Sequence, residues 1–402
     1  MSRKLKRANL VLACLLIATL IWLPCVHFFY TPAARVFRTP GVSPTARALA
    51  ARQFQLWTDP ATRQQELDQM RRSNAEWDFM GRTFLAWSLA NMSLRDLASA
   101  PGALKVMDQI IDETLKLERE RGLYFFLMHY AQTRPFNVQP AHSLFLDSEI
   151  AMMLAARRLV EEKPEYKPLL QGRVELMIAR MEQSPLLSAE SYPNEYWTFD
   201  HAAALAALRM ADRLDGTDHT ALCRRWIDIA KQKLIDHNTG LLVPRYNSWG
   251  QPLDSPRSSS MWFIVHCLQV VDPEFARDQY DRSKREYARE ICGFGYATEY
   301  PTAVKGQPDI DSGVVIPGLN ISAAGSGLAL MGAATFDDQE YLEALARTLN
   351  FAAFPSWHNG GLKFSASNQV GDAALLYAAV LGPLWEKVNP PAGVKPLRKE
   401  SP

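Results

Sequence analysis

Three carboxylic acids stand in places where they could do chemistry. Glu149 lies in the apolar stretch LDSEIA, Asp200 opens an Ala- and Leu-rich stretch, and Asp311 lies in the loop sequence DIDSG at 309–313. An unpaired carboxylate among apolar side chains is costly, so such groups need a reason to be there. When carboxyls face one cavity, burial raises the pKa of one and hydrogen bonding keeps another ionised. That division into acid and base is typical of glycoside cleavage, and we predict that Asp200, Glu149 and Asp311 are catalytic.

Aromatic and amide side chains are plentiful in the loops near these acids. Flat rings can stack on sugar faces, and amides and carboxyls can bond sugar hydroxyls. The predicted substrate-binding residues are Tyr192, Asn194, Tyr196, Trp197, Tyr246, Trp249, Asp309 and Trp357. Some of these rings could equally be core residues, because a large helical fold also needs large side chains.

Each acid has a structural alternative to catalysis. Asp200 could cap a helix, Glu149 could pair with a buried arginine, and Asp311 could cap the next segment or accept from loop amides. His201 follows Asp200 by about 100° on a helix and faces elsewhere, so we expect a satisfied core histidine there.

Helices must position these residues, since helical patterns are many and strand patterns few. An apolar helical stretch is repeatedly followed by an amphipathic one, with long Pro-, Gly- and aromatic-rich loops between some pairs. The predicted helices cover 59–95, 103–121, 143–162, 166–182, 196–214, 217–237, 258–271, 273–291, 322–334, 337–354 and 368–384. The pattern predicts an all-α (α/α)6 toroid, or barrel, over 59–389, with a small hairpin around 247–250. An irregular helical bundle is the alternative.

The N-terminus differs from the rest of the chain. The stretch 10–30 is apolar and follows a basic segment, long enough to cross a bilayer. Eight basic residues precede the first acidic residue, Asp59, which leaves 36 basic and 43 acidic residues behind it and a net charge of about −7 there. We predict an uncleaved transmembrane helix within 1–34, with a cleaved signal as the alternative. Residues 35–58 would be a linker or first helix, and 390–402 a disordered tail.

A family resemblance appears over about residues 140–290. The stretch DRLDGTD at 212–218, RWID at 225–228, LID at 234–236 and DPEF at 272–275 resemble the bacterial linalool dehydratase/isomerase family. The resemblance implies an (α/α)6 barrel that acts on a terpene alcohol without a metal or organic cofactor. It also implies that Asp200 and Ser191 stand where the family has catalytic cysteines and that Glu149 stands where it has a histidine. These differences predict another active site on the same fold.

Other classes of site find no support in the sequence. It has no P-loop, dinucleotide fingerprint or zincin motif, and its five cysteines and eight histidines show no metal-ligand spacing. We therefore expect no cofactor, no metal and no nucleic-acid partner. The oligomeric state is left open.

Three functions compete at this point. The first is a membrane-anchored enzyme with its body outside the cytoplasm, single-pass in a bacterial-type inner membrane, using carboxylate acid/base chemistry on a glycan or oligosaccharide. The second is a lyase or isomerase of a small apolar alcohol. The third is a non-catalytic glycan-binding or scaffold protein. An open groove with exposed aromatics favours the first, an enclosed dry pocket the second, and acids bound to arginines the third.

Overall fold

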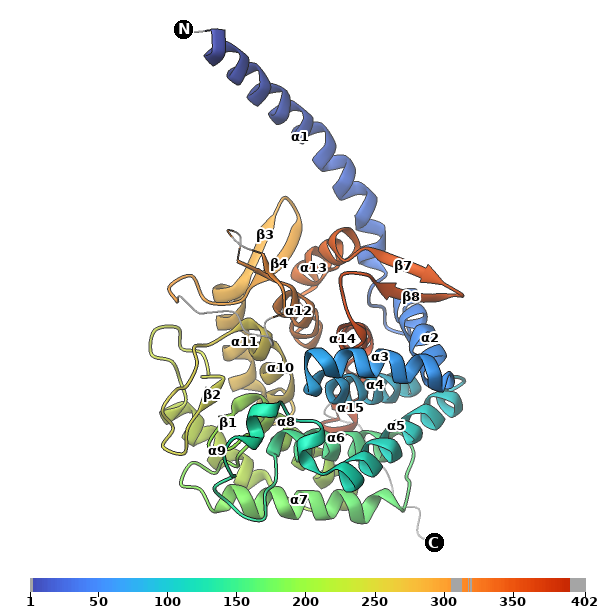
Figure 1. Cartoon of the computed structure of the whole chain (residues 1–402), viewed down its shortest axis with the longest axis vertical. Helices are drawn as coiled ribbons and strands as arrows, with labels where there is room; N and C mark the ends of the chain where they lie inside the picture. The colour runs from blue at the N-terminus through green and yellow to red at the C-terminus, as the bar shows by residue number, and fades with distance from the viewer. Residues whose placement is uncertain (1–2, 305–312, 317, 319, 391–402) are drawn as a thin grey trace.

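The computed structural model describes residues 3–304, 313–316, 318 and 320–390. In this part of the chain, helices in sequence alternate between an inner ring and an outer layer (Figure 1). The inner helices are α4 (Ala75–Arg95), α6 (Leu144–Val160), α8 (Thr198–Asp215), α10 (Ser258–Leu268), α12 (Ala323–Thr335) and α14 (Gln369–Val380). Each packs against the next, and α14 packs against α4, so the ring closes.

An outer helix precedes each inner one. These are α3 (Pro60–Ser73), α5 (Ala100–Arg121), α7 (Tyr166–Glu182), α9 (Thr220–Lys233), α11 (Pro273–Tyr287) and α13 (Gln339–Ala352). The closed ring with its outer layer confirms the predicted (α/α)6 barrel. The single helix predicted for 59–95 is two helices, because Asn74 caps α4 by accepting from the Glu76 N–H at 2.8 Å.

Composition explains which helices lie inside. The inner helix α8 is rich in alanine and almost wholly buried, while the outer helices α9 and α11 bury one face only. Small residues also let inner helices approach closely. A Cβ on Gly332 of α12 would lie 2.8 Å from the Trp262 ring of α10, so that position has no room for a side chain.

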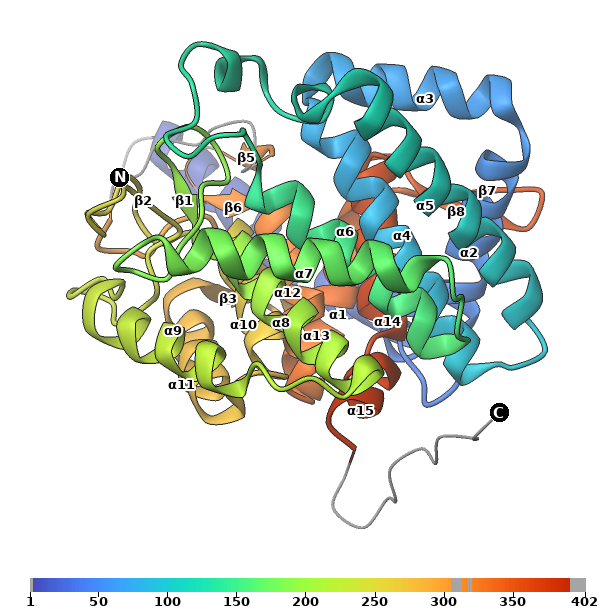
Figure 2. The same cartoon turned by 90° about the horizontal axis from the view of Figure 1, so that it is seen from below.

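The two ends of the ring differ. Short connections close the end where inner helices finish, and α15 (Pro383–Val388) packs there against α4, α6 and α8. Its Trp385 donates to the His266 carbonyl at 2.9 Å. Long connections gather at the other end, where inner helices begin, and we call that end the mouth (Figure 2). The long loops predicted from the sequence are these mouth loops.

Short strands and 3₁₀ turns shape the mouth loops. The turns are η1 (Leu123–Phe125) and η2 (His129–Gln132), and the strands are β1 (Tyr196–Trp197), β2 (Arg245–Tyr246), β3 (Ala288–Ile291), β4 (Phe294–Thr298), β5 (Val315–Ile316), β6 (Ile321–Ser322), β7 (Pro355–His358) and β8 (Gly361–Phe364). All pairings are antiparallel, in the orders β1-β2, β3-β4-β6-β5 and β7-β8. The hairpin predicted around 247–250 is present, with the Leu253 N–H bonded to the Arg245 carbonyl at 2.8 Å.

The N-terminal segment continues directly into the body. Helix α1 (Arg3–Arg35) is long and apolar enough to cross a membrane, and the most apolar part of it is not buried in the structure. It ends at a buried Ala34, and α2 (Pro44–Thr58) then packs against α14, α3 and β8. Within 35–58, predicted as a linker or first helix, residues 44–58 are thus a helix that contacts the barrel.

Candidate active site

Glu149 and Asp200 lie on neighbouring inner helices near the mouth. Glu149 is in the second turn of α6 and Asp200 in the first turn of α8, and these two helices pack against each other. Their exposed fractions are 0% and 4%. Backbone bonds align the two helix starts: the Leu144 N–H donates to the Glu190 carbonyl at 2.9 Å in the loop that leads to α8.

Burial favours the neutral form of Glu149. Burial raises its pKa well above the ordinary value, and the charges of Asp200 and Glu76 raise it further, while a hydrogen bond from Thr83 opposes the shift. The Thr83 hydroxyl donates to Oε2 at 2.6 Å. Oε1 is buried with no hydrogen-bond partner among the described residues. Oε1 is therefore the oxygen free to carry a proton and give it away.

Asp200 has the properties of a base that titrates near neutral pH. Burial raises its pKa to about 7, and the Ser191 hydroxyl beside it opposes the shift. The N-cap position of α8 is Trp197, with no side-chain capping bond, so Asp200 does not cap the helix. The capping alternative is therefore wrong.

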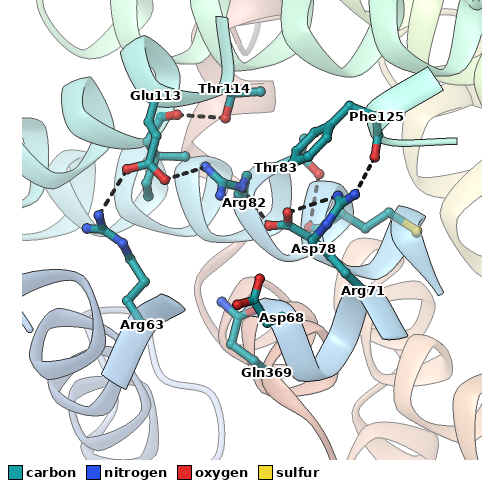
Figure 3. Close-up of polar contacts among 12 residues, drawn as sticks. Arg63, Asp68, Arg71, Asp78, Arg82, Thr83, Glu113, Thr114, Phe125 and Gln369 are labelled. Atoms are coloured by element: carbon teal, nitrogen blue, oxygen red, sulfur yellow. Dashed lines mark hydrogen bonds and ion pairs between the residues drawn. The ribbon is translucent and has the colours of Figure 1, made fainter. Parts of the chain in front are cut away.

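Two other buried acids near the mouth are bound to arginines, unlike this pair. Asp78 of α4 accepts from Arg82 at 2.7 Å and from Arg71 at 3.4 Å (Figure 3). Asp147, two residues before Glu149, is paired with Arg173. In the described residues neither Glu149 nor Asp200 forms an ion pair. The lack of an ion pair excludes the expected alternative of an arginine partner for Glu149. Asp372 in the first turn of α14 is likewise buried, burial raises its pKa to about 7, and it forms no ion pair among the described residues.

Acids and hydroxyls also meet around the rim of the mouth. Glu76 at the start of α4 accepts from the Tyr192 hydroxyl. The Tyr192 ring stacks on Tyr130 with centroids 4.7 Å apart, and the Tyr130 hydroxyl donates to Glu195 at 3.2 Å. The sequence predicted Tyr192 here, but Glu76 and Tyr130 were missed because they come from distant parts of the chain.

A second set of hydroxyls surrounds a buried acid at the start of α10 and α12. Glu299 is fully buried and accepts from Ser259 and from Ser322, both at 2.6 Å. Ser322 also caps α12 by accepting from the Gly325 N–H at 2.9 Å. The sequence analysis did not single out this cluster. Its only signal was the SSS run at 258–260, which is too common to point to a site.

The predicted substrate-binding residues lie in different environments. Trp197 is flanked by arginines, with the guanidinium carbons of Arg245 and Arg257 at 5.2 and 5.5 Å from its ring. Tyr196 lines a cavity of about 170 Å³ with Ser188, Glu190 and His142; its lining includes neither Glu149 nor Asp200.

Asn194 and Tyr246 have structural explanations. Asn194 has a φ of 56°, a left-handed conformation that asparagine tolerates, and its N–H donates to Glu190 at 2.6 Å. Tyr246 is fully buried, with its hydroxyl 2.8 Å from that of Ser188. It supports the stacked ring of Tyr196 from within the core.

Trp249 and Trp357 are exposed by 81% and 63%, outside the buried acid pair. Trp249 lies in the turn after β2, and Trp357 lies in β7. Asp309 and Asp311 lie outside the described residues.

Aromatic rings fill the barrel below the mouth. Phe199, one residue before Asp200, stacks on Phe263 at 4.0 Å, and Phe84, Trp87 and Tyr377 continue the cluster. His201 faces away from this site: its Nε2 accepts from the Ala189 N–H at 3.0 Å, and burial lowers its pKa to about 4. It is the satisfied core histidine expected. In the described part of the chain, no cluster of three or more His, Cys, Asp or Glu could hold a metal.

The raised pKa of Asp200 predicts a pH-dependent stability. Because the folded state holds the proton more tightly, the stabilisation is complete below about pH 4 and is lost as pH rises towards 7. The loss is about 4 kcal/mol at 1.36 kcal/mol per pH unit. The Asp200→Asn variant is neutral at every pH in this range and should not lose this stabilisation.

Urea unfolding of the full chain in detergent micelles, measured from pH 4 to pH 8, checks this prediction. The native chain should lose stability relative to Asp200→Asn across that range. Parallel curves for the two proteins would contradict a raised pKa at this position.

The fold and the site together define an (α/α)6 barrel protein with two buried carboxyls near its mouth that pair with no Lys or Arg side chain among the residues described. Comparison of the sequence with known families matches residues 165–370 to linalool dehydratase/isomerase. This match covers half of the chain, and the chain belongs to that family. It begins later than the stretch 140–290 in which the resemblance is visible from motifs, so that Glu149 lies outside it, and it reaches further towards the C-terminus.

Solved structures of low similarity also align. The GH76 α-mannanase of Bacteroides thetaiotaomicron aligns with a TM-score of 0.47 and 12% identity, covering 75% of this chain and 85% of its own. Cellobiose 2-epimerase of Bacillus thermoamylovorans gives 0.46 and 13%, with 75% and 86% covered. A glycoside hydrolase of family 105 from C. acetobutylicum gives 0.47 and 11%, with 78% and 94% covered. The closed ring of helix contacts, rather than these likenesses, defines the fold.

Proposed function

We propose that this protein is an acid–base enzyme that breaks a carbon–oxygen bond. Glu149 gives the proton on Oε1 to the leaving oxygen, and Asp200 accepts a proton from the group that replaces or releases it. The main support for this proposal is that these two buried acids form no ion pair within the described part of the chain, whereas Asp78 and Asp147 are each bound to arginine. This favours an enzyme over a scaffold, in which such costly groups would serve no purpose.

The rim of the mouth supports a hydroxyl-rich substrate, which we take to be a glycan or oligosaccharide. Acids that accept from hydroxyls occur at Glu76, Glu195 and Glu299, and carboxyl groups of this kind can also bond sugar hydroxyls. Glu195 is in addition paired with Arg134 and Arg245. Tyr130, Tyr192 and Trp197 add flat faces. In this reading Asp200 either activates water for hydrolysis or removes a proton from the sugar for elimination.

A small apolar alcohol is the second candidate substrate. It is supported by the aromatic rings of Phe199 and Phe263 next to the acids and by family membership. Glu149 would protonate the hydroxyl, water would leave, and Asp200 would take a proton from the adjacent carbon. Asp200, Ser191 and Glu149 would then replace the cysteines and histidine that the resemblance implies.

The remaining assignments stay predictions. We propose that α1 anchors the chain in the membrane in a single pass, with the barrel outside the cytoplasm, because the basic segment precedes the apolar stretch. Asp311 and Asp309 are proposed as further carboxyls of the mouth on the basis of the sequence alone.

A substrate panel tests the proposal. The full chain in detergent is incubated with oligosaccharides of differing linkage and, separately, with linalool and myrcene, and products are detected by mass spectrometry and gas chromatography. We expect turnover of an oligosaccharide by the native chain and none by Asp200→Asn. Turnover of linalool or myrcene alone would favour the second candidate, and turnover unchanged in Asp200→Asn would contradict the acid–base pair.

A further inference from the structure

The C-terminal part of helix α1 packs against the barrel, and the rest of the helix extends away from it. Its Tyr30 ring contacts Phe351 of α13 with centroids 5.5 Å apart, and its His27 ring contacts Phe294 of β4 at 5.9 Å. Arg35 at its end forms an ion pair with Glu343 at 3.4 Å. These contacts fix the direction of α1 relative to the barrel, so the anchor and the barrel surface around it are held as one piece.

The β3–β4 hairpin reaches back along α1 towards its apolar part. Its turn is Cys292-Gly293, both with positive φ, which suits a tight two-residue hairpin turn. A hollow of about 710 Å³ between this turn and α1 is lined by Cys292 and by α1 residues from Leu20 to Arg35, and its lining is mostly apolar. The tip therefore stands beside residues that the anchoring proposal puts at or in the bilayer.

The depth of the tip follows from helix geometry. The apolar stretch from Leu10 to Tyr30 is about 31 Å long at 1.5 Å per residue, close to the roughly 30 Å of a hydrocarbon core. His27, which touches the hairpin, lies roughly 5 Å below Tyr30 on this scale. With Tyr30 at the water-facing boundary, the tip reaches the boundary between headgroups and acyl chains.

Exposed apolar side chains continue around the same side of the barrel. They are Ile291 at the hairpin tip, Phe351 and Phe354 at the end of α13, and Trp357 in β7. Figure 1 shows β3–β4, α13 and β7–β8 on the side from which α1 leaves and α7 on the opposite side. Aromatic side chains of this kind suit the interface between lipid and water.

We propose that this surface, the tip rim (Ile291, Phe351, Phe354 and Trp357), is seated in the lipid interface as a second membrane contact beside α1. The inference rests on the proposed anchoring by α1. Figure 1 is viewed along the axis of the ring of inner helices, and α1 lies across that axis. The mouth therefore opens parallel to the membrane surface. Substrate then reaches Glu149 and Asp200 along the membrane surface.

Site-specific labelling of the full chain in vesicles tests this seating. Cys14 and Cys25 are replaced by alanine, and Cys292 is labelled with an environment-sensitive fluorophore, because Cys223 and Cys267 are buried. The vesicles contain phosphatidylcholine and phosphatidylglycerol, with nitroxide-labelled phosphatidylcholine as the quencher. A second label at Phe354→Cys and a matched control at Glu175→Cys on α7, both with Cys292→Ser, complete the set.

The labels at 292 and 354 should shift to shorter emission wavelength and lose most of their fluorescence to the quencher, while the label at 175 should change little. Flotation of the vesicles reports anchoring separately. Protein that floats without quenching at 292 and 354 overturns the second contact and leaves the anchor intact. Protein that does not float overturns the anchoring and the seating together.

Discussion

Glu149→Gln is expected to lose turnover while keeping its fold. Removing a positioned general acid lowers kcat by about 10²–10⁴-fold. Glutamine has the size of the neutral acid and can still accept from Thr83, so nothing at the site is left newly charged or empty. Steady-state kinetics on the substrate found by the panel, together with the melting temperature, measure both halves of this expectation.

The matched control is Asp147→Asn, on the same helix. Asp147 is a buried acid bound to Arg173, and its replacement removes one of the two carboxylates that pair with that guanidinium, Glu118 being the other. This variant should therefore lose stability and keep most of its kcat, the reverse of Glu149→Gln. If both variants lose turnover and stability alike, Glu149 is a structural acid and its proposed role is wrong.

The pH dependence of kcat should have two limbs. Activity rises as Asp200, with its pKa raised by burial to about 7, becomes ionised. It falls at higher pH as Glu149 loses its proton, because burial raises the pKa of that acid well above its ordinary value. The falling limb should be missing in the residual activity of Glu149→Gln.

Arg82→Met is expected to cause the largest loss of stability in the barrel. Arg82 is almost fully buried and bonds Asp78 at 2.7 Å and Glu113 at 3.2 Å (Figure 3). Breaking a buried pair by removing one partner costs about 3–5 kcal/mol. The buried charge of Asp78 would then keep, among the described residues, only the 3.4 Å bond from Arg71. Urea unfolding measures the change in the free energy of unfolding.

Two further variants decide what causes that loss. Arg47→Met removes an exposed arginine that pairs with Asp96, and it should cost under about 1 kcal/mol. Adding Asp78→Asn to Arg82→Met removes the buried charge of Asp78 and should restore part of the stability. A cost of Arg82→Met no larger than that of Arg47→Met would contradict a structural role for the Asp78 network.

Much of the fold can be predicted from local pattern. The alanine-rich stretch 196–214 predicts the buried helix α8, and the amphipathic stretch 217–237 predicts the outer helix α9, both within a few residues. The split at Asn74 was missed because the apolar pattern continues across it. Only the capping bond to the Glu76 N–H reveals the break.

Glu149 and Asp200 could be singled out from the sequence, whereas the α4 residues near them could not. Glu149 and Asp200 are conspicuous as carboxyls in apolar helices. Thr83 and Glu76 lie on α4 and come near Glu149 only because the inner helices pack into a closed ring. No local sequence pattern indicates this contact. Trp249 and Trp357 are exposed, and their part in substrate binding stays a prediction, because a tryptophan in a loop looks the same in sequence whether or not it lines a site.

Infrared spectroscopy of the carboxyl groups tests the central claim most directly. Asp200, with a pKa raised by burial to about 7, contributes a protonated-acid band to every spectrum at neutral pH. The native chain should show an additional carbonyl stretch of a protonated carboxylic acid, which Glu149→Gln should lack and Asp147→Asn should keep. This result would place a proton on Glu149 at working pH, as a general acid requires. A native spectrum identical to that of Glu149→Gln in this region would mean that Glu149 is ionised, and it would contradict the proposed acid–base pair.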